Sequence, residues 1–135
     1  MANEAVQVEG PYTTHDWTVG DTSGIEQFTL MIGGDPRTAQ ASTSGDSAPI
    51  FAGIAMTEKE ASSGQTNLGL TKEGIFVLTA NPNADVTMGA KVVISGVNVI
   101  RDAVAGDLLT GAIVGTAIEA IAKGTTGEVM LVGNT

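Results

Sequence analysis

Hydrophobic and polar residues alternate in short runs along this chain, a pattern typical of half-buried β-strands. The first firm run covers residues 25–32, where Phe28, Leu30 and Ile32 fall on one face of the expected strand. Further runs follow at short spacing and predict a mainly β chain: residues 50–56, 68–70, 74–79, 91–95, 97–100, 112–118 and 128–132.

Turn residues separate these runs, as in a small antiparallel β-barrel or β-sandwich. The turn signals are Asn81-Pro82-Asn83, Met88-Gly89-Ala90, Ser95-Gly96, Ala105-Gly106-Asp107 and Thr125-Thr126-Gly127. Residues 33–49 carry no periodicity, and we expect them to form a long exposed loop. At most two short helical turns are expected: one over Thr57 to Ser62, and one over Thr116 to Lys123, where a strand followed by a turn is favoured.

The chain also contains an approximate internal repeat. Two strands begin in nearly the same way, and each is followed, after a polar loop containing Gly, by a short run rich in Val and Ile. The repeat indicates compact β-structure closed by tight turns, with no catalytic group placed on it. The paired segments are Phe51-Ala52-Gly53-Ile54-Ala55 with Ile113-Val114-Gly115-Thr116-Ala117, and Gly74-Ile75-Phe76-Val77-Leu78 with Gly127-Glu128-Val129-Met130-Leu131.

Residues 1–17 are predicted to form an N-terminal arm, and residues 18–135 a single β domain. Val6 and Val8 alternate with polar residues as in a short strand, which Gly10-Pro11 then breaks. Tyr12 and Trp17 follow in a polar setting. These two aromatics either cover one end of the barrel or anchor the arm in a partner, since Tyr and Trp are enriched at interface hot spots.

Composition narrows the possible functions. A chain of 135 residues forms one domain and buries roughly two-thirds of its extended surface. Its net charge is −9 and its six Lys and Arg residues are scattered, which disfavours direct nucleic-acid binding. There is no Cys, no apolar run of about 18 residues and no secretory signal pattern at the start, so we expect a protein made in the cytoplasm with no membrane contact.

No residue pattern indicates catalysis, a metal or a cofactor. The only histidine, His15, would have to serve any Ser-His-Asp triad, and its one suggestive partner is Ser47 in a Gly-Asp-Ser turn. Such residues are typical of any exposed turn, so the triad is disfavoured. Asp16, Asp21 and Glu26 lack the alternating acceptors of a calcium loop. We therefore expect a protein that is not an enzyme and that acts through its surface.

Several segments resemble a known group of viral proteins. The central part is similar to the head decoration proteins of lambda-like tailed phages, and the second half resembles related, longer capsid cement proteins. Together the two resemblances cover about residues 18–133. The central segments are Ala48-Pro49-Ile50-Phe51-Ala52-Gly53-Ile54-Ala55 and Leu70-Thr71-Lys72-Glu73-Gly74-Ile75-Phe76; the later ones are Val86-Thr87-Met88-Gly89, Ala105-Gly106-Asp107, Val114-Gly115-Thr116-Ala117-Ile118-Glu119-Ala120 and Gly127-Glu128-Val129-Met130-Leu131.

The resemblance implies a small, β-tulip-like protein on the outer surface of an icosahedral capsid. There it would bind the major capsid protein, often as a homotrimer at three-fold or quasi-three-fold positions, and hold neighbouring subunits together against the pressure of packaged DNA. Val6, Val8, Tyr12 and Trp17 are the candidate capsid contacts. The alternative is a small β-barrel module that binds a ligand or carbohydrate, and a hydrolase using Ser47 and His15 is a more distant third.

Overall fold

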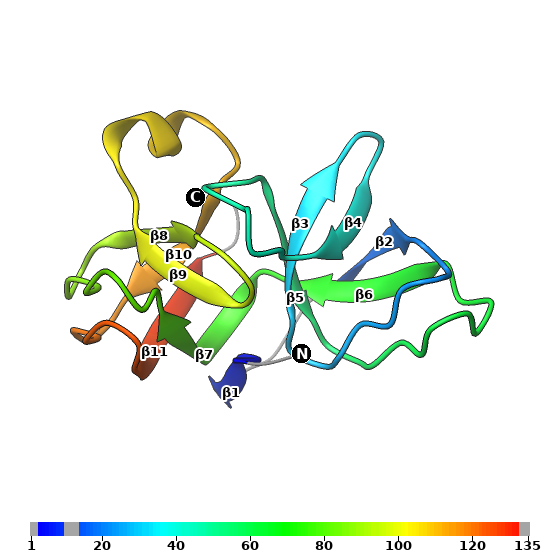
Figure 1. Ribbon diagram of the computed structural model, residues 1–135, viewed down its shortest axis with the longest axis horizontal. Coiled ribbons are helices and arrows are strands. Elements are labelled where there is room, and N and C mark those ends of the chain that lie inside the picture. Colours follow the sequence, from blue (N-terminus) through cyan, green and yellow to red (C-terminus); the bar gives the residue numbers. More distant parts are fainter. Residues whose placement is uncertain (1–2, 10–13, 133–135) are drawn as a thin grey trace.

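The computed structural model describes residues 3–9 and 14–132 and contains strands and one short 3-10 helix (Figure 1). The mainly β fold expected from the sequence is confirmed. The elements in chain order are β1 (Val6–Glu9), β2 (Thr14–Val19), β3 (Leu30–Gly34), β4 (Thr38–Ala41), β5 (Phe51–Ala55), β6 (Asn67–Thr71), β7 (Glu73–Ala80), β8 (Lys91–Ile94), β9 (Val99–Asp102), η1 (Ala105–Leu109), β10 (Ile113–Ala117) and β11 (Thr126–Val132).

Two closed sheets stand side by side in Figure 1. Strands β2 to β6 form a closed barrel, here called barrel one. In the second sheet a pairing between β7 and β9 joins β7, β11, β10, β8 and β9 into a ring, here called barrel two, with β1 added at the edge of β7. Closure matters because it removes the open sheet edges that invite aggregation.

The two barrels share one topology. In each, the first strand pairs in parallel with the third and antiparallel with the fifth. The second strand pairs antiparallel with the third and the fourth, and the fourth with the fifth. Strands β2 to β6 therefore correspond one by one to β7 to β11, and the fold repeats one five-stranded unit in tandem, an internal repeat that we call the duplication.

Hydrogen bonds outside the strands repeat as well. The isolated bridge between Ile25 and Lys59 in barrel one corresponds to that between Val86 and Ile121 in barrel two. Each barrel also has a turn residue with positive φ, Phe28 in one and Gly89 in the other, whose N–H donates to the last residue of the fourth strand. The duplication therefore extends to the connections between strands.

In both barrels, the backbone of the fifth strand lies so close to the fourth strand that one position of the fourth strand must be glycine. A Cβ on Gly53 would lie 2.9 Å from Thr71 O, and a Cβ on Gly115 would collide with the carbonyl of Met130. The two carbonyls occupy equivalent positions on the fifth strands. This shared constraint confirms the sequence similarity between Phe51–Ala55 and Ile113–Ala117, which are β5 and β10.

The barrels are joined by a shared apolar core. Its largest cluster combines Leu30, Phe51 and Ile54 of barrel one with Phe76, Leu78 and other residues of barrel two, all buried. A second cluster, around Met31, Leu68 and Leu70, fills barrel one itself. Burial of each such side chain contributes about 1.5–3 kcal/mol. Because the largest cluster takes its residues from both barrels, neither barrel has a complete core alone.

Asn98, in the turn between β8 and β9, adds a polar link between the barrels. Its side chain is buried, and its Oδ1 accepts a hydrogen bond from Leu30 N–H at 2.9 Å. Its own N–H donates to the hydroxyl of Ser42, also at 2.9 Å. Asn98 has a φ of 53°, a region that Asn tolerates better than most residues. The equivalent residue of barrel one, Arg37, has the same backbone conformation but is exposed.

Most expected strands are present, and four expectations were wrong. Residues 33–49 contain β4 instead of forming a long loop, and the first strand of the run 25–32 begins only at Leu30. Phe28 lies in a turn with a φ of 68° and does not share a strand face with Leu30. The short helix is η1, whereas Thr57 to Ser62 is not helical.

The pairing assigned to the second half of the repeat was also wrong. Residues 74–78 lie in β7, the first strand of barrel two, whereas the true counterpart of β11 is β6. Repetition of β-branched residues alone does not distinguish the first from the fifth strand of such a barrel. For residues 116–123, the favoured strand followed by a turn is confirmed.

The described residues of the expected arm are paired with the two sheets. β1 runs antiparallel along β7, with Val6 opposite Val77, and β2 is the first strand of barrel one. Ala5 is buried, and its N–H donates to Phe28 O at 2.8 Å. The alternation of Val6 and Val8 thus marks a strand within the fold, since the exposed edge of β7 offers it backbone partners.

We expect Asn98→Ala to lower the free energy of unfolding by roughly 2–3 kcal/mol, because Leu30 N–H would remain buried without its acceptor. Urea denaturation measures this loss. Arg37→Ala is the matched control at the equivalent, exposed turn position and should change stability by about 0.5 kcal/mol or less. Equal effects of the two substitutions would show that Asn98 acts only through its backbone conformation.

Candidate functional site

The two candidate valines of the N-terminal segment lie on the surface. Val6 is 55% exposed and Val8 is 44% exposed, so both project from β1 on the side away from the core. One edge of β1 is hydrogen-bonded to β7, and β1 is the terminal strand of its sheet. Among the described residues its other edge is therefore open to a further strand.

The two candidate aromatics differ. Trp17, on β2, is half-buried and packs against the core cluster of barrel one, with its ring close to Gly33. It covers that cluster, as one of the two alternatives expected. Tyr12 lies outside the described residues.

The residues considered for a triad are not joined to each other. His15 is exposed on β2, opposite Leu70 of β6. Ser47 is exposed on the loop between β4 and β5, where its Oγ accepts a hydrogen bond from Arg101 at 3.2 Å. Within residues 3–9 and 14–132, no group of His, Asp and Glu is arranged to hold a metal ion. No helix in this part of the chain has the length and apolar character needed to cross a bilayer.

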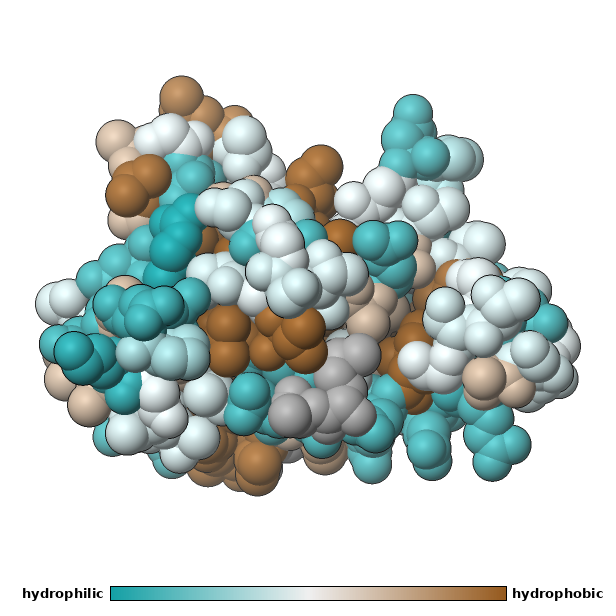
Figure 2. Space-filling view, viewed as in Figure 1, coloured by the Kyte–Doolittle hydropathy of each residue, from teal (hydrophilic) through white to brown (hydrophobic). Residues whose placement is uncertain are grey.

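Four exposed apolar side chains lie on two loops that meet at Gly111. Leu109 is 87% exposed, and Val104, Leu108 and Ile50 are each more than half exposed. The first three belong to the loop carrying η1, and Ile50 packs beside Gly111 at the end of that loop. Figure 2 shows apolar residues at the tip of this loop, at the upper left. We call Ile50, Val104, Leu108 and Leu109 the apolar patch.

The η1 loop is held in place by polar contacts, so its leucines do not fold back onto the core. Asp107 Oδ2 accepts hydrogen bonds from Val104 N–H at 2.9 Å and from Arg101 Nη1 at 3.2 Å. The Arg101 guanidinium also donates to the carbonyl of Asp102 and to Ser47. The loop therefore presents its apolar residues on a fixed support.

Duplication shows that the apolar residues are a specific feature of this loop. In barrel one the equivalent loop has the same cap, with Asp46 Oδ2 accepting a hydrogen bond from Thr43 N–H at 2.6 Å. There the positions of Val104 and Leu108 are occupied by Thr43 and Ser47. The geometry of the cap thus does not require apolar side chains. The sequence carried a usable signal, two adjacent leucines directly after a Gly-Asp turn, which the strand pattern concealed.

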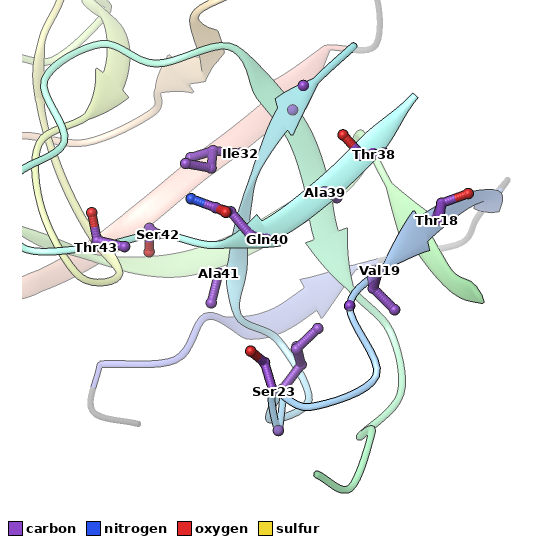
Figure 3. Close-up of a pocket in the computed structure, with 15 residues that line it drawn as sticks. Thr18, Val19, Ser23, Ile32, Thr38, Ala39, Gln40, Ala41, Ser42 and Thr43 are labelled. Atoms are coloured by element: carbon purple, nitrogen blue, oxygen red, sulfur yellow. The ribbon is translucent and has the colours of Figure 1, made fainter. Parts of the chain in front are cut away.

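A second feature is an open groove on barrel one, with a volume of about 840 Å³ (Figure 3). It lies between β4 and the segment of residues 20–25 that follows β2. Its walls are formed by Ser, Thr, Gly, Ala, Val and Ile residues together with Gln40, and none of the lining side chains is charged or aromatic. Carbohydrate sites usually place aromatic faces against the sugar, so this lining does not favour one.

Comparison with known proteins yields no matching family model, and no curated protein matches the chain.

The cap of the η1 loop predicts a pH dependence. The hydrogen bond from Val104 N–H, followed by the contact with Arg101, lowers the pKa of Asp107 below its ordinary value of 3.8. A lowered pKa in the folded state means that the cap is fully formed above the ordinary value and is lost as the pH falls through the lowered one. The amide chemical shift of Val104 should thus remain constant from pH 7 to 5 and change only below about 3.8.

Asp107→Asn is the control for this titration, since its amide does not ionise. The Val104 amide of this variant should show no transition in the same range. A transition centred well above pH 4 in the unmodified protein would contradict the proposed cap.

Proposed function

We propose that this chain is a capsid decoration protein, which binds the outer surface of an icosahedral viral head and bridges its subunits. The observation that carries the proposal is the apolar patch. Apolar side chains held out by a capped loop indicate a contact surface, because exposure of clustered leucines to water is unfavourable. The resemblance to head decoration proteins supplies the identity of the partner, the major capsid protein.

The N-terminal segment supplies a second contact of a different kind. Its strand β1 already uses one edge on β7, and a capsid strand can pair with the open edge, where Val6 and Val8 lie on one face. Pairing through a strand that is already ordered avoids much of the entropy cost of ordering a free arm. The described residues of the expected N-terminal arm are thus already paired within the fold before a capsid is bound.

Three copies in a homotrimer, as the resemblance implies, increase retention further. Once one copy is bound, the other two contact the shell at a high effective concentration, and overall avidity rises without any new kind of contact. The net charge of −9 keeps decorated particles apart by mutual repulsion.

The first functional prediction concerns the patch. Leu108→Ser places the serine of the equivalent barrel-one loop in the η1 loop. Because burial of a leucine contributes about 1.5–3 kcal/mol, affinity for purified shells of the cognate virus should fall roughly ten- to hundredfold. Cosedimentation with empty shells measures it.

A matched control is available elsewhere in the same duplication. Met88 is 61% exposed, and its barrel-one equivalent is Gln27. Met88→Gln should leave shell binding unchanged, since Met88 lies outside the patch. If Leu108→Ser binds as tightly as the unmodified chain, the patch is not the contact surface.

The second functional prediction concerns β1. Deletion of residues 1–12 would also remove the buried Ala5, so substitutions that keep β1 in place are more informative. Val6→Ser combined with Val8→Ser should cost about 1 kcal/mol or less of folding stability, because both side chains are largely exposed. The same variant should elute from shells faster, and thermal unfolding of the isolated protein verifies that its fold is intact. Unchanged elution would exclude β1 as a capsid contact.

The groove gives the alternative, a ligand-binding barrel module, a specific place to be tested. A panel of mono- and oligosaccharides should produce no saturable rise in melting temperature if the groove is not a sugar site. A rise that is abolished by Gln40→Ala would favour the alternative over the capsid role.

A further inference from the structure

We propose that the groove of barrel one receives an extended, uncharged segment of a capsid subunit, which adds to the open edge of β4 as an extra strand. This inference rests on the proposed function and adds a site to it. The site is separate from the apolar patch and from β1, and it lies where β4 leaves its neighbour β2.

Within the described residues, the edge of β4 opposite β3 has no strand partner beyond Ala39. β2 covers this edge of β4 only at Thr38 and Ala39, after which the chain turns away at Gly20. On the opposite edge, Ser42 N–H donates to Leu30 O at 3.0 Å, which fixes the side that each β4 residue faces. Because alternate residues of a strand direct their N–H and C=O to opposite edges, both backbone groups of Ala41 face the groove.

In barrel two the equivalent seam is closed. Asn81 N–H donates to Ile100 O at 2.8 Å, which keeps the segment after β7 on β9. Further along, the backbone N–H and hydroxyl of Thr87 donate to the carboxylate of Asp102 at 3.1 and 2.8 Å. The same topology can therefore be sealed by two short-range contacts.

Barrel one lacks both contacts. Asp102 is replaced by Ala41, and Thr87 by Glu26, so the side-chain pair that closes the seam is absent. Gly20 takes the place of Asn81, and no corresponding hydrogen bond joins it to Ala39 within the described residues. The loss of both contacts leaves the edge of β4 open.

Lys59 holds the groove open from the other side. This buried lysine donates from Nζ to the carbonyls of Asp21 and Ser23, each at 2.8 Å, and to that of Glu60 at 3.2 Å. These bonds fasten the segment after β2 to the connection between β5 and β6, away from β4. Its barrel-two equivalent, Ile121, has an apolar side chain and makes no such bonds.

The lining defines the occupant. Figure 3 shows Ala41 pointing toward the segment that carries Ser23, whereas Gln40 points to the opposite side, toward Ile32. The lining carries no charge to pair with a phosphate or carboxylate and no aromatic face for a sugar or base. An unpaired backbone edge beside small apolar and hydroxyl side chains matches an extended polypeptide with small or β-branched residues. The chain's net charge of −9 disfavours a strongly acidic segment.

The test closes the groove by introducing into barrel one the side-chain pair that closes the seam of barrel two. Glu26→Thr combined with Ala41→Asp recreates the pair formed by Thr87 and Asp102. Cosedimentation with purified empty shells of the cognate virus should show affinity reduced about tenfold or more for this double variant, as expected when a strand-addition site is lost. Glu26→Thr alone, which leaves the edge of β4 open, is the matched control and should bind like the unmodified chain.

Hydrogen exchange provides a readout that needs no substitution. In the unmodified protein the amide of Ala41 should exchange more slowly when shells are bound, because it would donate to the added strand. If the protein binds shells while Ala41 exchanges at the free rate and the double variant binds equally well, the groove inference is wrong and the decoration role stands. If the unmodified protein does not bind shells at all, the decoration role fails, and the capsid segment as occupant fails with it.

Discussion

The structure depends on the junction between two barrels that are incomplete alone. A shared apolar cluster supplies most of the contact, and the buried Asn98 fixes how the barrels are oriented, since a hydrogen bond has a direction and apolar contact does not. Strand β1 lies over the same junction: it pairs with β7, and the residue before it, Ala5, donates to Phe28 of barrel one. The surfaces proposed to bind a partner all lie on these two joined barrels.

The two halves share one framework but differ in the loop and the seam that are proposed to bind a partner. In this framework the first and third strands pair in parallel and close the barrel, and a glycine of the fourth strand lies against a carbonyl of the fifth. An aspartate also caps the loop before the fourth strand. Within this framework, one capped loop is apolar and the other is polar. One seam is open and the other is closed by hydrogen bonds. Each barrel thus serves as the reference for what was changed in the other, which is why both features can be identified without a bound partner.

The sequence predicted the elements better than their connections. Runs of apolar residues located β5 to β11, because these strands bury one face or, as in β5, both faces. The apolar pattern did not reveal β4, whose Thr-Ala-Gln-Ala side chains are small and weakly apolar. It also placed Phe28 in a strand, because periodicity does not reveal a positive φ. The duplication was visible only at β5 and β10, where the shared glycine is required by packing. Elsewhere the halves differ in sequence and agree only in backbone hydrogen bonds, which side-chain patterns do not record. The candidate valines of β1 were found because they alternate, whereas the η1 leucines interrupt the pattern and were missed.

The order of the strands also bears on how the chain acquires its shape during synthesis. All five strands of barrel one are complete by Thr71, so they can begin to pair while the second half is still being synthesised, whereas the shared core needs both halves. Barrel two cannot close until β11 emerges, because β11 pairs with β7 along nearly its whole length. Barrel one also depends on the second half, because the acceptor for the Leu30 N–H is the side chain of Asn98. Strand β11 therefore controls whether barrel two closes, because it is the strand that joins β7 to β10.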